Sequence, residues 1–165
     1  MKSISEFTFH PIQGRISPGD ESSVIKIWTD EAEMDPQEAA RRISELVLLI
    51  RDGEGNIAGV STAAKMKVKF LNENWFYQLR YFIVPAFRFA GLGFKLTKAT
   101  VEHLEEKYLM EHERMVGVLA VQQNHDIRYL QAARKTILRN VPFVFAGHTS
   151  TGDPVQIYYF NNARI

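Results

Sequence analysis

The residues best suited to hold a ligand form the spacing Arg88-x-x-Gly91-x-Gly93, which lies between a predicted strand and a predicted helix. Glycine permits backbone conformations and close backbone approaches that a Cβ atom would prevent. The amides of a first helical turn have no intrahelical partner, and the helix dipole adds positive potential there. With Lys95 and Lys98 in the first half of the helix, this turn is predicted to bind an anion.

Two common phosphate-binding loops are excluded by the residues themselves. No string fits the P-loop pattern G-x-x-x-x-G-K-[ST], and Gly91-Leu92-Gly93 lacks the third glycine of a dinucleotide-binding fingerprint. The spacing that does occur, preceded by Ile83-x-Pro85, resembles the acetyl-CoA signature [RQ]-x-x-G-x-[GA] of the GNAT-type N-acetyltransferase superfamily.

The elements on both sides of this turn are predicted from local patterns. The segment 75–84 is rich in aromatic and β-branched residues, so it is predicted to be a strand that ends at Pro85. After the turn, apolar residues recur at steps of three to five, which predicts a long helix. Its apolar stripe comprises Leu92, Leu96, Ala99, Leu104 and Tyr108.

The rest of the chain is predicted to alternate between strands and helices. Asp20 is predicted to cap the first helix, and Asp35-Pro36 to open a short second helix that ends before Leu46. Gly59, inside a predicted strand, suggests a bulge or a close approach of another backbone. Strands are predicted over residues 6–12, 46–50, 57–68, 115–121, 143–146 and 155–160, and a further helix over residues 126–139.

This order, β-αα-β-β-β-α-β-α-β-β, is the one that the GNAT superfamily uses, so the resemblance covers nearly the whole chain. It implies the α/β class with a mixed (α+β) sheet, in the GNAT acyl-CoA N-acyltransferase fold with a splayed central sheet. A length of 165 residues suggests one domain spanning residues 1–165.

Bulk composition narrows the class of partner. A hydrophobic fraction of 45% and a charged fraction of 24% are those of a soluble globular protein, and a net charge of +1 gives no footprint for nucleic acid or an anionic membrane. The absence of cysteine removes disulfides, thiolate zinc sites and cysteine nucleophiles. With no signal-peptide core and no apolar run of membrane-spanning length, a cytoplasmic protein is expected. The five histidines show no ligand spacing, so no metal is expected.

The resemblance implies acetyl-CoA as co-substrate. Its pyrophosphate would lie on the turn, and its pantetheine arm would run like an added strand beside the strand end, where an N–H near Phe82 or Ile83 would act as oxyanion donor. Asn124 would hold the arm through hydrogen bonds. The implied cofactor-binding residues are Phe82, Ile83, Val84, Arg88, Phe89, Ala90, Gly91, Leu92, Gly93, Phe94 and Asn124.

The residues for proton transfer depart from the pattern of the superfamily. Gln78 and Arg80 occupy the central strand where many members have a carboxylate base, and Gln131 stands where a tyrosine would protonate the thiolate. The remaining candidates are Glu73 or a water chain as base, His125 in the expected cleft loop, and Tyr129, Tyr158 or Tyr159 as acid. Because none of these residues occupies the base or acid position of the superfamily pattern, no single side chain is expected to be an indispensable base.

Two classes of function follow from these residues. The first is an acetyl-CoA-dependent N-acetyltransferase that acts on a primary amine of a small molecule or a protein. The alternative is an acyl-CoA-binding module without transferase activity, and a purely structural interaction domain would leave the Arg88–Gly93 spacing unused. The sequence identifies neither the acceptor substrate nor the oligomeric state, for which a homodimer is one alternative.

Overall fold

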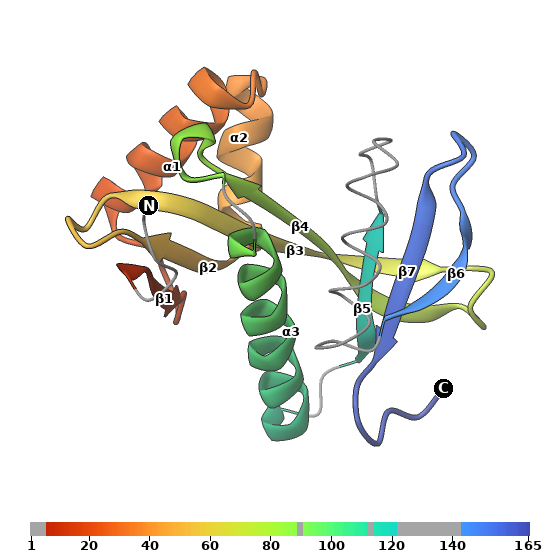
Figure 1. Cartoon of the computed structure of the whole chain (residues 1–165). Helices are drawn as coiled ribbons and strands as arrows, with labels where there is room; N and C mark the ends of the chain where they lie inside the picture. Colours follow the sequence, from red (N-terminus) through yellow and green to blue (C-terminus); the bar gives the residue numbers. More distant parts are fainter. Residues whose placement is uncertain (1–5, 89–90, 112–113, 122–142) are drawn as a thin grey trace. The chain divides into compact units, whose positions relative to one another are not determined.

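The computed structural model describes residues 6–88, 91–111, 114–121 and 143–165. The elements in these ranges are shown in Figure 1. In chain order they are β1 (Thr8–Pro11), α1 (Pro18–Glu31), α2 (Pro36–Arg42), the 3-10 turn η2 (Ile43–Glu45), β2 (Leu46–Arg51), β3 (Ile57–Val68), β4 (Asn74–Ile83), the 3-10 turn η3 (Pro85–Phe87), α3 (Leu92–Glu111), β5 (Met115–Val121), β6 (Val144–His148) and β7 (Pro154–Tyr159).

The described strands pair as a seven-stranded sheet in the order β1-β2-β3-β4-β5-β7-β6. β4 and β5 run parallel, whereas β1 with β2, β2 with β3, β5 with β7 and β6 with β7 are antiparallel. The register of the β4–β5 ladder, as far as the structure describes it, runs from Trp75 to Leu79 on β4. The predicted α/β class with a mixed sheet is confirmed.

The chain divides into two compact units. The first unit comprises Met1–Ala63 and Arg80–Thr100, and the second comprises Ala64–Leu79 and Val101–Ile165. Three elements, β3, β4 and α3, run from one unit into the other. The expectation of one domain over residues 1–165 stays a prediction.

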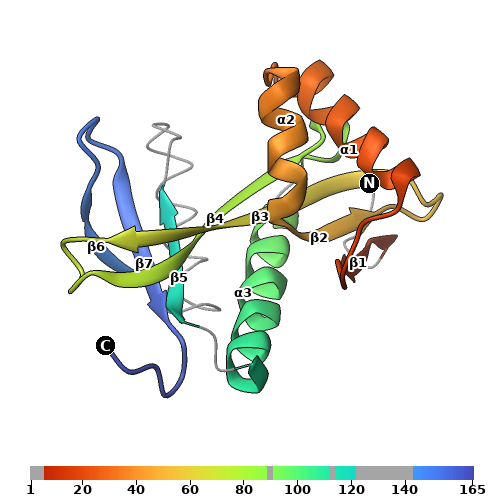
Figure 2. The same cartoon turned by 180° about the vertical axis from the view of Figure 1, so that it is seen from behind.

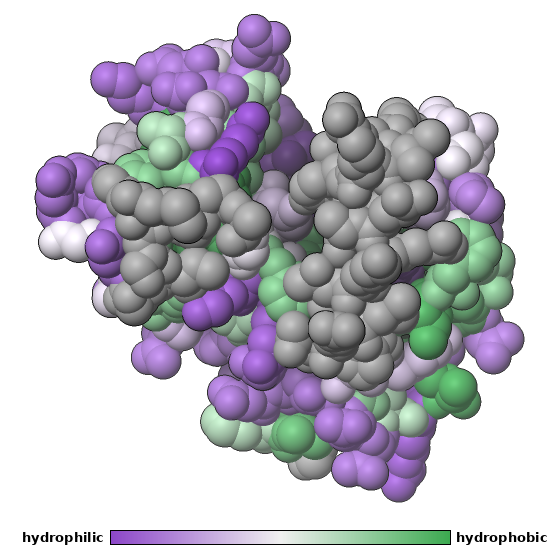
Figure 3. All heavy atoms as spheres, in the orientation of Figure 1, coloured by the Kyte–Doolittle hydropathy of each residue, from purple (hydrophilic) through white to green (hydrophobic). Residues whose placement is uncertain are grey.

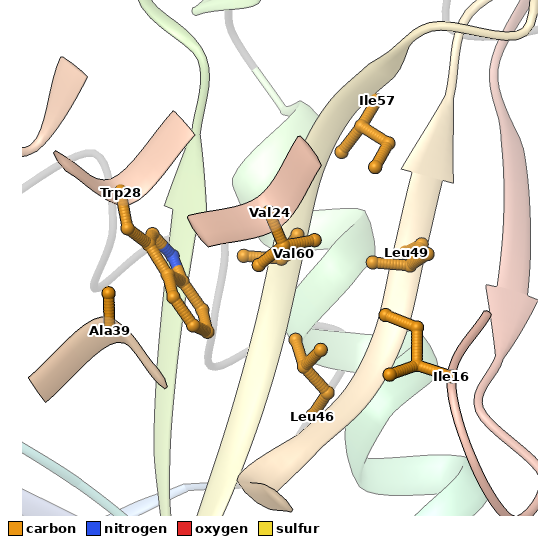
Figure 4. Close-up of a cluster of buried hydrophobic side chains, with 8 residues drawn as sticks. All are labelled: Ile16, Val24, Trp28, Ala39, Leu46, Leu49, Ile57 and Val60. Atoms are coloured by element: carbon orange, nitrogen blue, oxygen red, sulfur yellow. The ribbon is translucent and has the colours of Figure 1, made fainter. Parts of the chain in front are cut away.

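In the first unit, α1 and α2 cover one face of β2 and β3, and the first turns of α3 cover the other (Figures 1 and 2). Side chains from both helices converge with those of the two strands in one apolar cluster (Figure 4). On the opposite face, Leu92 and Leu96 are fully buried, and the hydroxyls of Thr100 and Ser61 form a buried hydrogen bond of 2.8 Å. The cluster of Figure 4 comprises Ile16, Val24, Trp28, Ala39, Leu46, Leu49, Ile57 and Val60.

The outer surface over α1 and α2 is mostly hydrophilic (Figure 3). Glu38 and Arg41 contribute to it with an ion pair of 2.8 Å. The two helices are thus amphipathic, with their apolar stripes in the cluster of Figure 4.

In the second unit, the core is formed by side chains of β3, β4, β5 and β7. Its buried members are Val68, Phe76, Val116, Leu119, Val155 and Ile157. The ring of Tyr159 lies 5.4 Å from the ring of Phe76, centroid to centroid. No described helix is long and apolar enough to span a membrane.

Most local predictions are confirmed, with one cap and one stripe position corrected. Asp20 is not the N-cap of α1: Ser17 is, because Pro18 suits the first helical position and the Ser17 hydroxyl accepts from the Asp20 amide at 3.2 Å. In α3, the predicted apolar stripe contained Ala99, but Ala99 is only half-buried and the neighbouring Thr100 is fully buried. A threonine can be buried there because its hydroxyl hydrogen-bonds to the Ser61 hydroxyl. The helix predicted over residues 126–139 lies outside the described residues.

Two other local predictions hold in detail. The Asp35 carboxylate accepts from the amides of Gln37 and Glu38, as a capping residue should. At Gly59 an added Cβ would lie 3.0 Å from the Phe82 carbonyl oxygen and 2.7 Å from Ile83 Cδ1, so the close approach predicted there exists.

Candidate functional site

The end of β4 presents its backbone groups to two different sides. The amide of Val84 donates to Ala58 O of β3 at 2.9 Å. Because the backbone groups of successive strand residues alternate in direction, Phe82 also faces β3, whereas the N–H and C=O of Ile83 face the opposite edge. The contact of the Phe82 carbonyl with Gly59 agrees with this assignment.

Arg88 folds back onto this strand end. Its Nε donates to the carbonyl of Ile83 at 2.9 Å, and its guanidinium lies 5.2 Å from the centre of the Phe82 ring. The 3-10 turn η3 makes this return path, with the amide of Arg88 donating to Pro85 O at 3.1 Å. The guanidinium therefore lies against the end of β4.

The predicted anion-binding turn leads directly into α3. Gly91 has a φ of +100°, a conformation that side-chain-bearing residues rarely adopt, and its carbonyl accepts from the Lys95 amide at 2.9 Å. Leu92, Gly93 and Phe94 are consequently the first helical residues, and helix geometry offers their amides no intrahelical acceptor. The amides of a first helical turn are the groups that bind anions at helix N-termini, so the anion site at this turn stays a prediction.

Gly93 is enclosed by a side chain. A Cβ at this position would come within 2.9 Å of Tyr81 Cε2 and 3.2 Å of its hydroxyl oxygen. The ring of Tyr81 on β4 therefore packs against the first turn of α3. The sequence pattern indicated a need for glycine here but did not indicate this partner.

The first unit brings the described cofactor-binding candidates together. Leu92 is fully buried, so only its backbone can meet a ligand. The candidates of this group are Phe82, Ile83, Val84, Arg88, Gly91, Leu92, Gly93 and Phe94. Phe89, Ala90, Asn124, His125 and Tyr129 lie outside the described residues.

Glu73 lies in the turn before β4, in the second unit. Its carboxylate forms an ion pair of 3.0 Å with Lys67, and its side chain is 64% exposed. These contacts are those of a solvated turn residue, and the role of Glu73 as a base stays a prediction.

Tyr158 and Tyr159 point to opposite faces of β7. The Tyr158 hydroxyl donates to the Glu105 carboxylate, at 3.0 and 3.1 Å from its two oxygens, and the Asn161 amide donates to Glu105 at 2.7 Å. Burial, together with the Glu105 carboxylate, raises the pKa of Tyr158 to about 12. A hydroxyl that already donates to a carboxylate and has a raised pKa is a weak proton donor, while the Tyr159 ring is packed on Phe76.

Sequence reasoning missed one charged contact next to the strand end. Glu45, in η2, accepts from Arg41 Nη1 at 2.7 Å through Oε1, and its Oε2 lies 3.6 Å from Arg80 Nη1 on β4. Burial lowers the pKa of Arg80, as does the nearby Arg42, against the opposing effect of Glu45. The Arg41–Glu45 pair was detectable from its i,i+4 spacing, but the contact with Arg80 spans 35 positions of the chain (80 minus 45) and leaves no local signal.

No protein-family model matches the sequence, and no curated protein matches it in a sequence search. Similar solved structures do exist. An acetyltransferase of the GNAT family from Streptococcus pneumoniae aligns with a TM-score of 0.65 at 13% identity, over 94% of this chain and 100% of the other.

Two further structures show the same similarity. The ribosomal-protein-S5-alanine acetyltransferase from Vibrio fischeri has a TM-score of 0.63 at 9% identity, over 99% of this chain and 98% of the other. A GNAT superfamily phosphinothricin acetyltransferase from Sinorhizobium meliloti, solved in complex with acetyl-CoA, has a TM-score of 0.64 at 15% identity, over 96% and 90% of the two chains. At identities this low, the structural similarity establishes a shared fold but not a shared function, because one fold hosts several functions. The chain therefore has the fold of the GNAT-type N-acetyltransferase superfamily, which the Arg88-x-x-Gly91-x-Gly93 spacing had implied.

Proposed function

We propose that the protein is an acetyl-CoA-dependent N-acetyltransferase that moves an acetyl group to a primary amine of a small molecule or a protein. One observation carries the proposal: in a GNAT fold, Gly91 has a positive φ and leads directly into α3, whose first-turn amides have no i−4 helical acceptor. These are the groups on which the pyrophosphate of acetyl-CoA would lie.

The strand end would orient the thioester. The N–H of Ile83 lies on the edge of β4 opposite to β3, so it is the oxyanion donor that the geometry favours over Phe82. The neutral amine attacks the thioester carbonyl carbon and forms the C–N bond, the C–S bond breaks, and the departing thiolate takes up, through water, the proton that the nitrogen releases. The residues of this chain contribute position and charge stabilisation to that step.

Proton transfer in this proposal needs no dedicated side chain. Arg80 and Gln78 occupy β4 where many members of the superfamily have a carboxylate, and the Tyr158 hydroxyl donates to Glu105. The rate should therefore rise with pH toward the pKa of the acceptor amine, about 10 for an alkylamine. A loss of about 10²–10⁴ in kcat/KM in His125→Ala, Glu73→Gln or Tyr129→Phe would contradict this part of the proposal.

The test combines calorimetry with acetyl-CoA and a thiol-release assay on a broad amine panel. Gly91→Glu places a carboxylate among the anion-facing amides and should weaken acetyl-CoA binding by at least about 100-fold in a folded protein. Gly19→Glu is the matched control, because a Cβ at Gly19 has no neighbour within 4 Å. Unchanged affinity in folded Gly91→Glu would remove the cofactor site from this turn.

The same assay separates the enzyme from the binding module. Binding of acetyl-CoA with thiol release only in the presence of an amine supports the transferase. Binding without release for any acceptor at any pH would favour the module instead.

A further inference from the structure

A small cavity lies where α1 begins beside β1, entirely within the first unit. Its volume is about 330 Å³, at the lower end of the range of about 300–1,000 Å³ that small-molecule sites occupy. The chain passes from β1 through the loop of residues 12–17 into α1, and side chains of these segments and of β2 form the walls (Figure 2).

The cavity lies on the face of the sheet that α1 covers. The β1–β2 register sets His10 opposite Leu49, and paired or alternate strand residues project from the same face, so Arg51 projects there too. Leu49 packs in the same cluster as Val24 of α1. The Arg88–Gly93 turn leads instead into α3, which covers the other face of β2 and β3 (Figures 1 and 2). This cavity is therefore separate from the proposed acetyl-CoA site.

The floor of the cavity is apolar and its rim is polar. Ile16 and Leu49 line it with buried side chains. His10, Gln13 and Arg15 also line it, and all three are exposed. A ligand can thus enter from solvent, meet apolar surface at the floor and be oriented by polar groups at the rim, which is the usual composition of a small-molecule site.

The one carboxylate among the described lining residues is already neutralised. Arg51 Nη2 donates to Asp20 Oδ1 at 2.6 Å, and Arg51 Nη1 donates to the Gly55 carbonyl at 3.0 Å. The hydrogen bond from Arg51 lowers the pKa of Asp20, against the opposing effect of burial. Asp20 is therefore ionised at neutral pH, and its charge and that of Arg51 compensate each other within the wall.

Arg15 is the charge that this compensation leaves over. Within the part of the chain that the structure describes, no residue forms an ion pair or hydrogen bond with its side chain. With His10 counted as neutral, the lining residues carry one positive charge in excess. A carboxylate supplies the one negative charge needed, and its two oxygens fit the parallel N–H groups of a guanidinium. A phosphate monoester, with a charge of about −1.5 to −2, would exceed it.

We propose that this cavity binds a small organic monocarboxylate, whose carboxylate pairs with Arg15 and whose short apolar chain lies on Ile16 and Leu49. The inference adds a second ligand site to the protein, and it does not depend on the proposed N-acetyltransferase function.

The experiment titrates the full chain, labelled with ¹⁵N, and follows its amide signals by NMR. The probes are butyrate, its uncharged analogue butyramide, and n-propyl phosphate, which carries more charge on a chain of similar length. Butyrate should bind at least about tenfold tighter than butyramide and no more weakly than propyl phosphate. The largest shifts should occur in the loop of residues 12–17 and the first turn of α1.

Substitutions at Arg15 test the charge pair. Arg15→Gln should weaken butyrate at least about tenfold without weakening butyramide. Arg15→Lys should restore part of the affinity, since it keeps the charge but loses the planar fork. Arg164→Gln is the matched control, because it removes the same charge from an exposed arginine of the second unit that does not line the cavity. Melting temperatures verify that each variant folds.

Gly91→Glu separates this cavity from the Arg88–Gly93 turn, the other predicted anion site. Butyrate affinity that is retained in Gly91→Glu and lost in Arg15→Gln supports the inference, and acetyl-CoA affinity should show the opposite dependence. The inference would be overturned by no binding of butyrate, by equal binding of butyrate and butyramide, or by tighter binding of propyl phosphate. A loss in Gly91→Glu without a loss in Arg15→Gln, or an equal loss in Arg164→Gln, would also overturn it.

Discussion

The two glycines of the turn are needed for different physical reasons. Gly91 has a φ of +100°, so any side chain strains its backbone, whereas Gly93 has ordinary helical geometry but faces the ring of Tyr81. Gly91→Ala should lower the free energy of unfolding by about 1–2 kcal/mol, measured by urea denaturation. Gly19→Ala, which adds a Cβ in open space, should change it by less than about 1 kcal/mol.

Gly93→Ala provides the contrast to Gly91→Ala. The atoms that the new methyl group would meet are the far end of Tyr81, a side chain that is 43% exposed and can turn away. Gly93→Ala should therefore lower the free energy of unfolding by less than Gly91→Ala does. In a double-mutant cycle, Gly93→Ala should cost less in the Tyr81→Ala background than in wild type, because the ring that the new methyl group meets is absent. Equal costs for Gly91→Ala and Gly93→Ala would show that backbone strain at Gly91 is not the deciding factor.

At the scale of the elements, the pairing of β5 with β7 requires a glycine at position 117. A Cβ at Gly117 would overlap the carbonyl oxygen and carbon of Tyr158 on β7, and a paired strand backbone cannot move aside. Gly117→Ala should lower the free energy of unfolding by at least about 2–3 kcal/mol, measured by chemical denaturation. A nearly neutral Gly117→Ala would mean that β5 and β7 are not paired in this register.

The Glu105 carboxylate links α3 to β7 through Tyr158. The pKa of Tyr158 is about 12 in the folded protein and near 10 when unfolded, so the unfolded state loses the proton first. The stability from this contact is therefore fully present below pH 10 and declines as pH rises through 12. Between these values wild type should lose more unfolding free energy than Tyr158→Phe, and parallel pH curves would contradict the assignment.

Local sequence patterns predicted the elements well and the contacts between distant elements poorly. The limits of β3, the start of α3 and the cap at Asp35 follow from alternation, from glycine and from the Asp-Pro pair, all of which act within a few residues. The corrected cap at Ser17 is a local competition between two good capping residues. The Tyr81–Gly93 packing and the Glu45–Arg80 contact depend on how strands and helices meet, which no local pattern encodes.

At the scale of the whole molecule, β3, β4 and α3 each belong to both units. Neither unit can unfold without disrupting elements of the other, so residues 1–165 should unfold as one domain in a single cooperative transition. Calorimetry tests this by comparing the calorimetric and van't Hoff enthalpies, which should agree. Two resolved transitions would show two domains. Gly117→Ala provides a check, because a change confined to the second unit should lower the only melting temperature.

The hydrogen bond between Arg88 and the Ile83 carbonyl has a consequence for the speed of binding. A ligand arm that adds to the edge of β4 would need this same carbonyl, so the arm can dock only while Arg88 is released. At about 1 M salt, where a Debye length near 3 Å removes electrostatic steering, Arg88→Ala should associate with acetyl-CoA faster than wild type in stopped-flow experiments. It should also dissociate faster, because the guanidinium no longer contacts the bound anion. Arg88 would then delay both the arrival and the departure of the cofactor, and slower association of Arg88→Ala would show that release of this side chain does not limit entry.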